Sequence, residues 1–577
     1  MVKKLTREDH LIEIQSLISN NQYHKALSEL KKVVEEYPDD YKLRINYGNI
    51  HHFLGNITEA KNEYEKSLEL SKSKEALNNL AVIHIEKRDY ENAIKLCNDA
   101  IGIDASYADA YYNISLCFEL LDDYTESLNN LNKCLDIDGN HFKAMILKYK
   151  VAQNTCDWPV ISELEKILND NIEMGLEHPF MNVSRYDDES INYRNARSWQ
   201  KNNQSNIVSN DISLSKTKNE KIKIGFMCGE FRNHPTFFLI KNLFKHINRK
   251  LFNIYVFSYA HENYCREYIE KDVDNFIDIN DQSDDLTETK VKSFNLDILI
   301  DLSVLIPHNK MSIIKRKLAK STVSYLGFPG TSCAENYDYI IADRIVIPET
   351  EREFYSEKII YLPNFYQVND GEIKARQFDN NNFKLKHQLP LNKIILSCFN
   401  QSFKIEKSLF ECWINILKKH KSTVIWLLKE NQIMQNNITK FASSQGIEID
   451  RIIFADRLPR DMHLQRLCLS DIALDTLTYN GHTTTTDAIQ CGIPIVGFSG
   501  NHFASRVSHS LLKSINLNEL VAFNLEEYSK KIQNLIEDDV YREQISKKLR
   551  SHEFMSDFYN LEKFTRDFEK ALISIMN

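Results

Sequence analysis

Glycine and proline are scarce in this sequence, which has 15 and 11 of them among 577 residues. Because tight turns depend on these two residues, the scarcity disfavours a turn-rich all-β fold and favours helices. Apolar runs of the roughly 20 residues that a membrane-spanning helix needs are also missing. Met1–Asp9 has no apolar stretch behind its basic pair, so we expect neither a signal peptide nor a membrane partner.

Paired cysteines and an excess of positive charge are missing too. The eleven cysteines are widely spaced and no two form a CxxC pair, which disfavours a zinc site or a thioredoxin-type motif. Scattered thiols are typical of a reducing compartment, so we expect a cytoplasmic protein. The net charge of −9 argues against a nucleic-acid partner, because phosphate backbones need a clustered basic face. The length suggests about three to four structural units.

The first third of the chain repeats itself with spacings of 34, 33 and 34 residues between equivalent small residues. These small residues are Ala26, Ala60, Ala93 and Ser127. The period predicts tetratricopeptide repeats over residues 1–155, about four to five helical pairs that stack into an α superhelix. Gly48, Ala81 and Ser115 occupy a second equivalent position, where the two helices of a pair must approach closely. An unrelated helical bundle is the alternative.

Asparagine recurs at one further position of the repeat, at Asn46, Asn79 and Asn113. Stacked repeats would line up these amides, and an amide offers both a donor and an acceptor to a peptide backbone. We therefore predict that these residues bind a protein or peptide acceptor. The alternative is that they are solvated or make contacts within a repeat.

The composition changes after the repeats. Residues 156–220 end in a polar tract over 200–221, which indicates a helical or polar linker. Short runs rich in Ile and Val then alternate with helical stretches, the pattern of parallel α/β units. A polar break over 369–389 divides them, so we expect two doubly wound, Rossmann-like domains, an N-terminal one over 221–388 and a C-terminal one over 389–577.

Two series of apolar runs are the candidate strands. The first is Ile222–Phe226, Ile254–Ser258, Ile298–Leu302, Val323–Leu326, Tyr339–Ala342 and Ile359–Leu362. The second is Ile394–Cys398, Val424–Leu428, Ile452–Phe454, Ile472–Leu474 and Ile495–Phe498. Because ligands of doubly wound sheets bind beyond the carboxyl ends of the strands, we expect the site in the loops there.

Three such loops stand out: Gly229–Thr236, Phe399–Ile405 and Asp475–Asp487. In the last, Gly481 permits a tight turn and a run of threonines opens a helix, whose free backbone N–H groups suit a diphosphate. A plain helix cap would use the same residues. Lys404 would supply the matching cation.

The familiar phosphate motifs are missing. The sequence has no GxxxxGK[ST] loop, no GxGxxG fingerprint and no DxD-type carboxylate pair at a convincing strand end. A diphosphate leaving group that is neutralised by a helix N-terminus and a lysine needs no Mg²⁺. This combination predicts a two-domain glycosyltransferase of the GT-B type that needs neither a metal nor another cofactor.

Four motifs that follow the repeats resemble those of protein O-GlcNAc transferase and its SPINDLY-like bacterial relatives, glycosyltransferase family 41. The motifs are Asn233–Thr236, Leu326–Ser332, Asn400–Ile405 and Asn480–Thr484. The resemblance runs to about residue 535. It implies an inverting transferase that moves a sugar, with GlcNAc as the expected one, from a UDP-sugar to Ser/Thr hydroxyls of proteins.

The resemblance also implies site residues. Those that match the family's donor site are Gln401, Lys404, Arg460, His463, Arg466, His482, Thr483, Thr484, Asp487, Gly330 and Thr331. Lys404 would stabilise the leaving phosphate, and His234 matches an active-site histidine near the sugar. The usual pKa of histidine suits proton transfer, and orienting the sugar is an equally weighted alternative.

Some residues depart from the family pattern. Tyr479 and Phe238 stand where animal members carry Cys and His, and Leu302–Leu305 replaces a glycine-containing loop. A bulkier, less polar pocket would favour a plain hexose, so a UDP-hexose or other sugar with a different acceptor is an alternative. His482, which fucose-transferring SPINDLY proteins lack, favours UDP. A non-catalytic scaffold that binds nucleotide sugar is a further alternative, disfavoured by the intact candidate residues. The oligomeric state stays open.

Overall fold

The computed structural model describes residues 7–20, 22–203, 221–307, 309–374 and 380–576. It divides into two compact units. The repeat unit comprises residues 1–152 and 160–168, and the α/β unit comprises residues 153–159 and 169–577. We describe each unit by itself.

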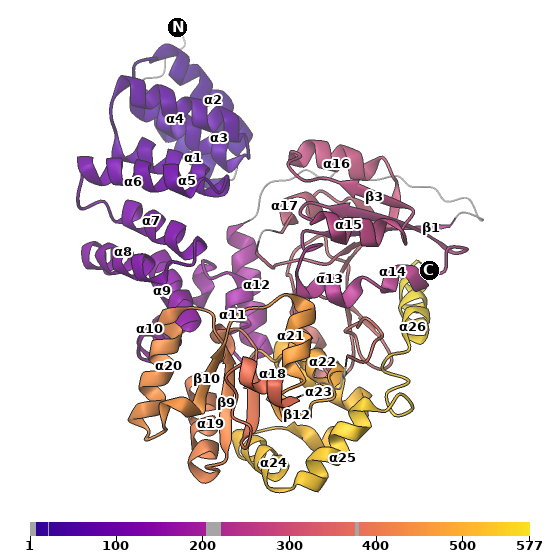
Figure 1. The fold of residues 1–577 in the computed structure, drawn as a ribbon. Helices are drawn as coiled ribbons and strands as arrows, with labels where there is room; N and C mark the ends of the chain where they lie inside the picture. Colours follow the sequence, from indigo (N-terminus) through magenta and orange to yellow (C-terminus); the bar gives the residue numbers. More distant parts are fainter. Residues whose placement is uncertain (1–6, 21, 204–220, 308, 375–379, 577) are drawn as a thin grey trace. The chain divides into compact units, whose positions relative to one another are not determined.

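Ten helices in the described part of the chain follow one another from the start of the repeats, and the first eight pack as four consecutive pairs, drawn from indigo to purple in Figure 1. They are α1 (Arg7–Ser19), α2 (Tyr23–Glu36), α3 (Tyr41–Phe53), α4 (Ile57–Leu70), α5 (Lys74–Glu86), α6 (Tyr90–Ile103), α7 (Ala108–Leu120), α8 (Tyr124–Ile137), α9 (Phe142–Thr155) and α10 (Trp158–Asp170). The four small residues that revealed the period are all fully buried. The predicted helical repeats are therefore confirmed.

Close packing inside a pair explains Gly48. A Cβ atom at this position would lie 2.6 Å from the ring of Tyr64, so α3 and α4 can cross only where α3 lacks a side chain. The Tyr64 hydroxyl donates to Asn49 Oδ1 at 2.8 Å, which fixes the ring in this position.

The three equivalent asparagines do not share one environment. Asn46 is exposed, whereas Asn113 is buried and donates to Asn78 Oδ1 of the preceding repeat at 2.8 Å. Asn79 is half-buried and donates to Asn49 Oδ1 at 2.8 Å, again one repeat back. Two of the three amides thus join neighbouring repeats. Such contacts differ both from the expected row of acceptor-binding amides and from the alternative of solvated or intra-repeat residues. Their role in acceptor binding stays a prediction.

The α/β unit contains two parallel sheets. The first has the order β3-β2-β1-β4-β5-β6-β7 and the second the order β10-β9-β8-β11-β12-β13. Their strands are β1 (Ile222–Cys228), β2 (Phe252–Ser258), β3 (Asn275–Asp278), β4 (Leu296–Asp301), β5 (Ala319–Ser324), β6 (Tyr339–Ala342), β7 (Lys358–Tyr361), β8 (Ile394–Cys398), β9 (Thr423–Leu428), β10 (Ile452–Ala455), β11 (Ile472–Leu474), β12 (Ile495–Phe498) and β13 (Val521–Ala522). The strand order reverses beside β1 and beside β8, and doubly wound sheets bind ligands at such points.

Helices cover both sheets. They are α11 (Pro179–Asn182), α12 (Glu189–Asn202), α13 (Pro235–Ile240), α14 (Leu243–His246), α15 (Asn263–Glu270), α16 (Asp284–Lys292), α17 (Met311–Ile314), α18 (Asn380–Lys386), α19 (Lys407–Lys419), α20 (Gln432–Ser444), α21 (Arg460–Leu467), α22 (Thr483–Gln490), α23 (Val507–Ser514), α24 (Leu525–Glu537), α25 (Asp539–Arg550) and α26 (Leu561–Ser574). Apolar residues at helical spacing hold them on the sheets: α19, for example, buries Leu409, Phe410, Trp413, Ile414 and Leu417. Among the described residues, no helix combines the length and the apolar character that crossing a lipid bilayer requires.

The segment expected as a linker packs into the α/β unit over residues 169–203. Gln200 Nε2 donates to Ser332 O at 2.9 Å, and the Phe503 N–H donates to Glu189 Oε2 at 3.0 Å. The polar side chains here are buried hydrogen-bonding partners, so polarity was a poor guide to solvent exposure. The rest of the expected polar tract, residues 204–220, lies outside the described residues.

The last helix does not stay with the second sheet. On α26, the fully buried Phe568 packs on Tyr325 beside the first sheet, with ring centroids 5.4 Å apart. The Asn248 N–H donates to Glu569 Oε1 at 2.6 Å, and Figure 1 shows α26 beside α14. The expected boundary at residue 389 therefore marks where the second sheet begins, while the chain end returns to the first.

Candidate active site

A cavity of about 490 Å³ lies between the carboxyl ends of the two sheets. The loops that follow β1, β8 and β11 line it. Six predicted site residues share this cavity: His234, Gln401, Lys404, His482, Thr483 and Thr484. The sequence places them on three loops far apart along the chain, and the fold brings them together.

Lys404 is held by two neighbours from the loop after β11. Its Nζ donates to Asn480 O at 2.9 Å and lies 3.9 Å from the centre of the Tyr479 ring, a cation–π contact. Burial lowers the pKa of the Lys404 ammonium to about 7, although the carboxylate of Asp475 acts in the opposite direction. The lysine is thus poised to gain charge when an anion enters the cavity.

The turn that carries Lys404 is anchored on both sides by residues 153–159. Ser402 Oγ donates to Asn154 O at 2.7 Å, and Trp158 Nε1 donates to Ile405 O at 3.1 Å. This short piece of chain lies between two segments of the repeat unit in sequence but belongs to the α/β unit.

The N-terminus of α22 borders the same cavity. Gly481 is required there, because a Cβ atom would lie 2.4 Å from Thr484 Oγ1. Its N–H donates to Asp475 Oδ1 at 2.6 Å, and burial raises the pKa of Asp475 to about 6. The first turn of α22, which begins at Thr483, therefore leaves unpaired backbone donors beside Lys404 in an arrangement suited to a diphosphate.

His234 caps α13 on the opposite wall. Its Nδ1 accepts from the Thr236 N–H at 3.3 Å and lies 3.7 Å from Glu230 Oε2. Burial lowers the pKa of His234, which favours the neutral ring. With Nδ1 acting as an acceptor, the ring proton is on Nε2, so the histidine offers a donor rather than a free base.

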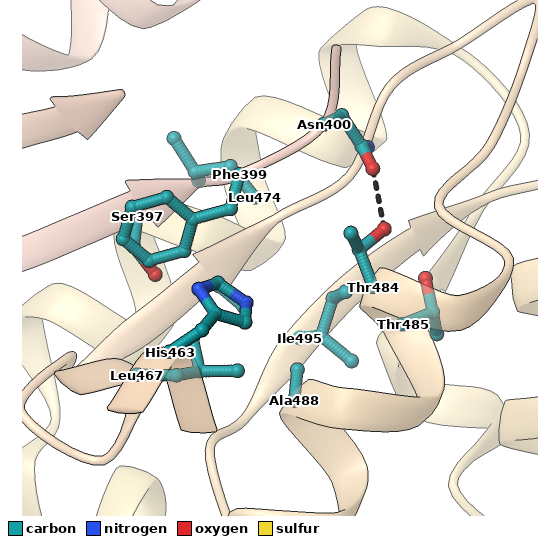
Figure 2. A pocket seen from close by; sticks show the side chains of 11 residues that line it. Ser397, Phe399, Asn400, His463, Leu467, Leu474, Thr484, Thr485, Ala488 and Ile495 are labelled. Carbon is teal, nitrogen blue, oxygen red and sulfur yellow. Dashed lines mark hydrogen bonds between the residues drawn. The ribbon is translucent and has the colours of Figure 1, made fainter. Parts of the chain in front are cut away.

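A narrow crevice of about 20 Å³ adjoins the cavity. Figure 2 shows His463 facing Phe399, and Asn400 bonded to the Thr484 hydroxyl. The His463 and Phe399 rings are 5.2 Å apart and nearly perpendicular. Arg466 donates to His463 Nδ1 at 3.2 Å, and burial together with this arginine lowers the pKa of His463 to about 3. Arg466 is buried and does not line the cavity. Its contribution is to hold the His463 ring through this hydrogen bond.

Other predicted donor residues do not line the cavity either. Arg460 and the buried Asp487 form a bidentate ion pair with each other. Arg460 also lies 4.9 Å from the centre of the Phe238 ring, and both border a separate cavity of about 420 Å³. Phe238 therefore does not shape the cavity that holds Lys404.

The loop that contains Gly330 and Thr331 lines the cavity only through its first residues. Thr331 Oγ1 points into the protein and donates to the buried Glu357 Oε2 at 2.6 Å. Leu326 and Gly327 line the cavity instead, and Leu326 adopts a left-handed φ of 73°. The predicted roles of Gly330 and Thr331 at the donor are therefore not supported by this structure.

The loop after β4 lines the cavity through other residues than those expected. Leu302–Leu305 is buried in the protein, and the apolar Ile306 and Pro307 that follow line the cavity in its place. The expectation that Leu302–Leu305 itself makes the pocket bulkier is therefore wrong. Tyr479, by contrast, does line the cavity, where its ring stacks on His482 with centroids 4.8 Å apart.

Several lining residues were missed. Asn400 and Gln367 hold the α22 turn, through Thr484 and through a 2.7 Å bond to Thr486 Oγ1 respectively. The missed cations that line the cavity are Arg232 and Arg457. Asn400 and Arg232 stand inside quoted loops, so their position was a usable signal. The other two fall outside every motif.

Comparisons with known proteins agree with this geometry. The model of Glycosyl transferase family 41 matches residues 206–381 and 381–568, and tetratricopeptide repeat models match residues 17–81, 74–107 and 108–141. The probable UDP-N-acetylglucosamine--peptide N-acetylglucosaminyltransferase SEC of Arabidopsis thaliana is 31% identical over 366 residues, which cover 62% of this chain and 37% of that protein. The UDP-N-acetylglucosamine--peptide N-acetylglucosaminyltransferase of Caenorhabditis elegans is 22% identical over 465 residues, which cover 61% and 40%. The chain thus spans about two fifths of the length of these relatives.

A solved structure shows the same fold. A mutant of the Thermobaculum terrenum O-GlcNAc transferase is 20% identical and aligns with a TM-score of 0.65, over 92% of this chain and 96% of that one. This likeness and the two parallel sheets confirm the predicted architecture, a tetratricopeptide superhelix followed by a GT-B fold. Because the family model matches more than half of its residues, the chain belongs to glycosyl transferase family 41.

Proposed function

We propose that this protein transfers GlcNAc from UDP-GlcNAc to Ser/Thr hydroxyls of proteins, with inversion at the anomeric carbon. The observation that carries the proposal is the single cavity in which Lys404 and the N-terminus of α22 converge between two sheets. The names of the relatives above support the sugar, the nucleotide and the peptide acceptor.

The proposed reaction gives each of these groups a part. The acceptor oxygen forms a bond to the anomeric carbon while the bond from that carbon to the UDP oxygen breaks on the opposite side, and the proton of the acceptor hydroxyl is released to solvent water. Charge then grows on the leaving phosphate, where the Lys404 ammonium and the first turn of α22 stabilise it, and such fixed charges are usually the largest catalytic contribution. The Nε2–H of His234 would orient a donor or acceptor oxygen. This scheme assigns no step to a metal or a resident cofactor.

The partners are proposed on the same grounds. The repeat superhelix would hold the acceptor polypeptide, since stacked repeats present an extended surface. A reducing compartment such as the cytoplasm is supported by the eleven cysteines, all of them free thiols.

Radiolabelled donors test the proposal. The purified protein would be offered UDP-GlcNAc, UDP-glucose or GDP-fucose together with a cell lysate, and label in protein would be counted with and without EDTA. We expect transfer from UDP-GlcNAc that resists EDTA, and a turnover about 10²-fold lower in Lys404→Ala. Transfer only from UDP-glucose would replace the sugar, nucleotide binding without transfer would favour a scaffold, and near-normal turnover of the variant would remove Lys404 from the mechanism.

A further inference from the structure

His502 is a buried histidine outside every motif of the sequence, and both of its ring nitrogens are engaged. Nε2 donates to Thr478 O at 2.7 Å, and Nδ1 accepts from Asn192 Nδ2 at 3.2 Å. These two bonds fix one tautomer of a neutral ring, with its proton on Nε2. The ring therefore joins α12 to the loop that follows β11.

The residue after Thr478 is the one that packs on the catalytic lysine. The Tyr479 ring lies 3.9 Å from Lys404 Nζ and stacks on His482. The His482 ring in turn lies 3.3 Å from Ala504 O, and the Asn480 N–H donates to the same carbonyl at 2.9 Å. The segment around His502 thus holds the loop after β11 at Thr478, Asn480 and His482.

The residues that hold the segment around His502 lie in α12 and just before it. Asp187 Oδ1 accepts from the Asn501 N–H and from Ser505 Oγ, both at 2.6 Å. Asn192 Nδ2 also donates to Tyr186 O at 3.2 Å, which orients its amide toward His502. Residues expected to form a linker therefore hold the loop that contains His502.

We propose that His502 is a positioning residue for sugar transfer: it ties Thr478 to α12 and so keeps Tyr479 and Lys404 where the leaving phosphate forms. His502 does not line the cavity, and it acts through the loop that it holds. This inference rests on the proposed function. Its test therefore includes one readout that does not need sugar transfer.

Two substitutions separate the two ring nitrogens. His502→Asn keeps a group near Nδ1 for Asn192 but loses the Nε2 donor, whereas the longer amide of His502→Gln keeps a donor within reach of Thr478 O and an acceptor for Asn192. We expect kcat to fall about tenfold in His502→Asn, since small misplacements of reacting groups carry such losses, and to return to within about threefold of wild type in His502→Gln. His509→Asn, on α23 with Ser499 Oγ as its partner at 2.9 Å, is the matched control and should keep full activity.

The second readout is the acetylation rate of Lys404 as a function of pH, measured by peptide mass spectrometry. The ionisable groups that face Lys404 are Asp475, Glu430, Cys398, His482 and the Tyr479 phenol, and none of them is changed in these variants. We expect the midpoint of acetylation to rise by about one pH unit in His502→Asn, because a lysine released from its packed position regains its charge more easily, and to stay in place in His502→Gln.

The outcomes are distinct. Wild-type protein without any sugar transfer would overturn the proposed function, while the acetylation midpoints would still test the position of Lys404. A wild-type kcat and midpoint in His502→Asn, or a His502→Gln variant as impaired as His502→Asn, would overturn the inference. If His502→Asn does not fold, Asn192→Ala removes the hydrogen bond to His502 Nδ1 from the side of α12. This variant should lower kcat and raise the acetylation midpoint, as His502→Asn does. Unchanged values in Asn192→Ala would overturn the inference.

Discussion

Binding of UDP should weaken as pH rises above 7, because Lys404 loses its charge there. The pKa of this lysine, about 7, is lowered from its usual value by burial. The folded protein therefore holds the ammonium form below this pH and the neutral amine above it. A diphosphate favours the charged form, so binding raises the pKa again and takes up a proton. UDP does not add its own titration above pH 7, because the second pKa of a phosphate is about 6.

The size of the effect follows from the charged fraction. If UDP binds only the protonated form, the apparent Kd equals the intrinsic Kd divided by that fraction. With a pKa of about 7, the fraction falls from about one half at pH 7 to about 1% at pH 9, so the affinity should fall about 50-fold over this range.

Isothermal titration calorimetry measures both parts of this prediction. Titrations of UDP at pH 7, 8 and 9 give the affinity, and titrations in two buffers with different ionisation enthalpies give the protons taken up. We expect uptake of about half a proton at pH 7 and nearly one at pH 8. Lys404→Arg is the control, because a guanidinium stays charged throughout and should abolish both trends. A constant wild-type affinity from pH 7 to 9, or an equal trend in Lys404→Arg, would refute the reasoning.

Three further predictions concern the loop and the repeats. Gly481→Ala should weaken UDP binding at least about tenfold in calorimetry, because the new methyl group meets a threonine hydroxyl and displaces the first turn of α22. An unchanged affinity would mean that the turn accommodates the methyl group without moving. Gly48→Ala should cost about 1–3 kcal/mol in urea unfolding followed by circular dichroism, because the methyl group overlaps a buried tyrosine ring; a wild-type midpoint would contradict this packing. Alanine at Asn46, Asn79 and Asn113 together should lower turnover of protein acceptors more than of short peptides, and equal losses would count against acceptor binding by these amides.

The sequence predicted the regular parts of the fold well, because their signals are local. Ten of the eleven candidate strands coincide closely with observed strands, since buried parallel strands are continuous apolar runs, while the candidate Val323–Leu326 shares only its first two residues with β5. The two strands that were missed give weak signals for physical reasons. β3 is an edge strand with polar ends at Asn275 and Asp278, and β13 has only two residues.

The residues that line the candidate cavity were predictable where the local sequence carries a distinct signal. Gly481 and Lys404 were recognised because a tight turn before a helix and a lone lysine after a strand are visible in the sequence. The partners of each side chain were not visible. Nothing in the sequence says that Asp487 pairs with Arg460, or that Leu302 is buried rather than facing the sugar, since both depend on contacts between residues distant along the chain.

The turn that carries Lys404 is tied to Asn154 and Trp158, which precede the first strand by more than sixty positions. Anyone who trims this protein to a minimal transferase would choose a start near residue 221, where the alternation of strands begins, and would discard both anchors. A start after residue 155 would still remove one of them. A truncated enzyme should therefore begin no later than residue 153, which means that the repeats cannot be cut away at their own sequence boundary without loosening the chemistry.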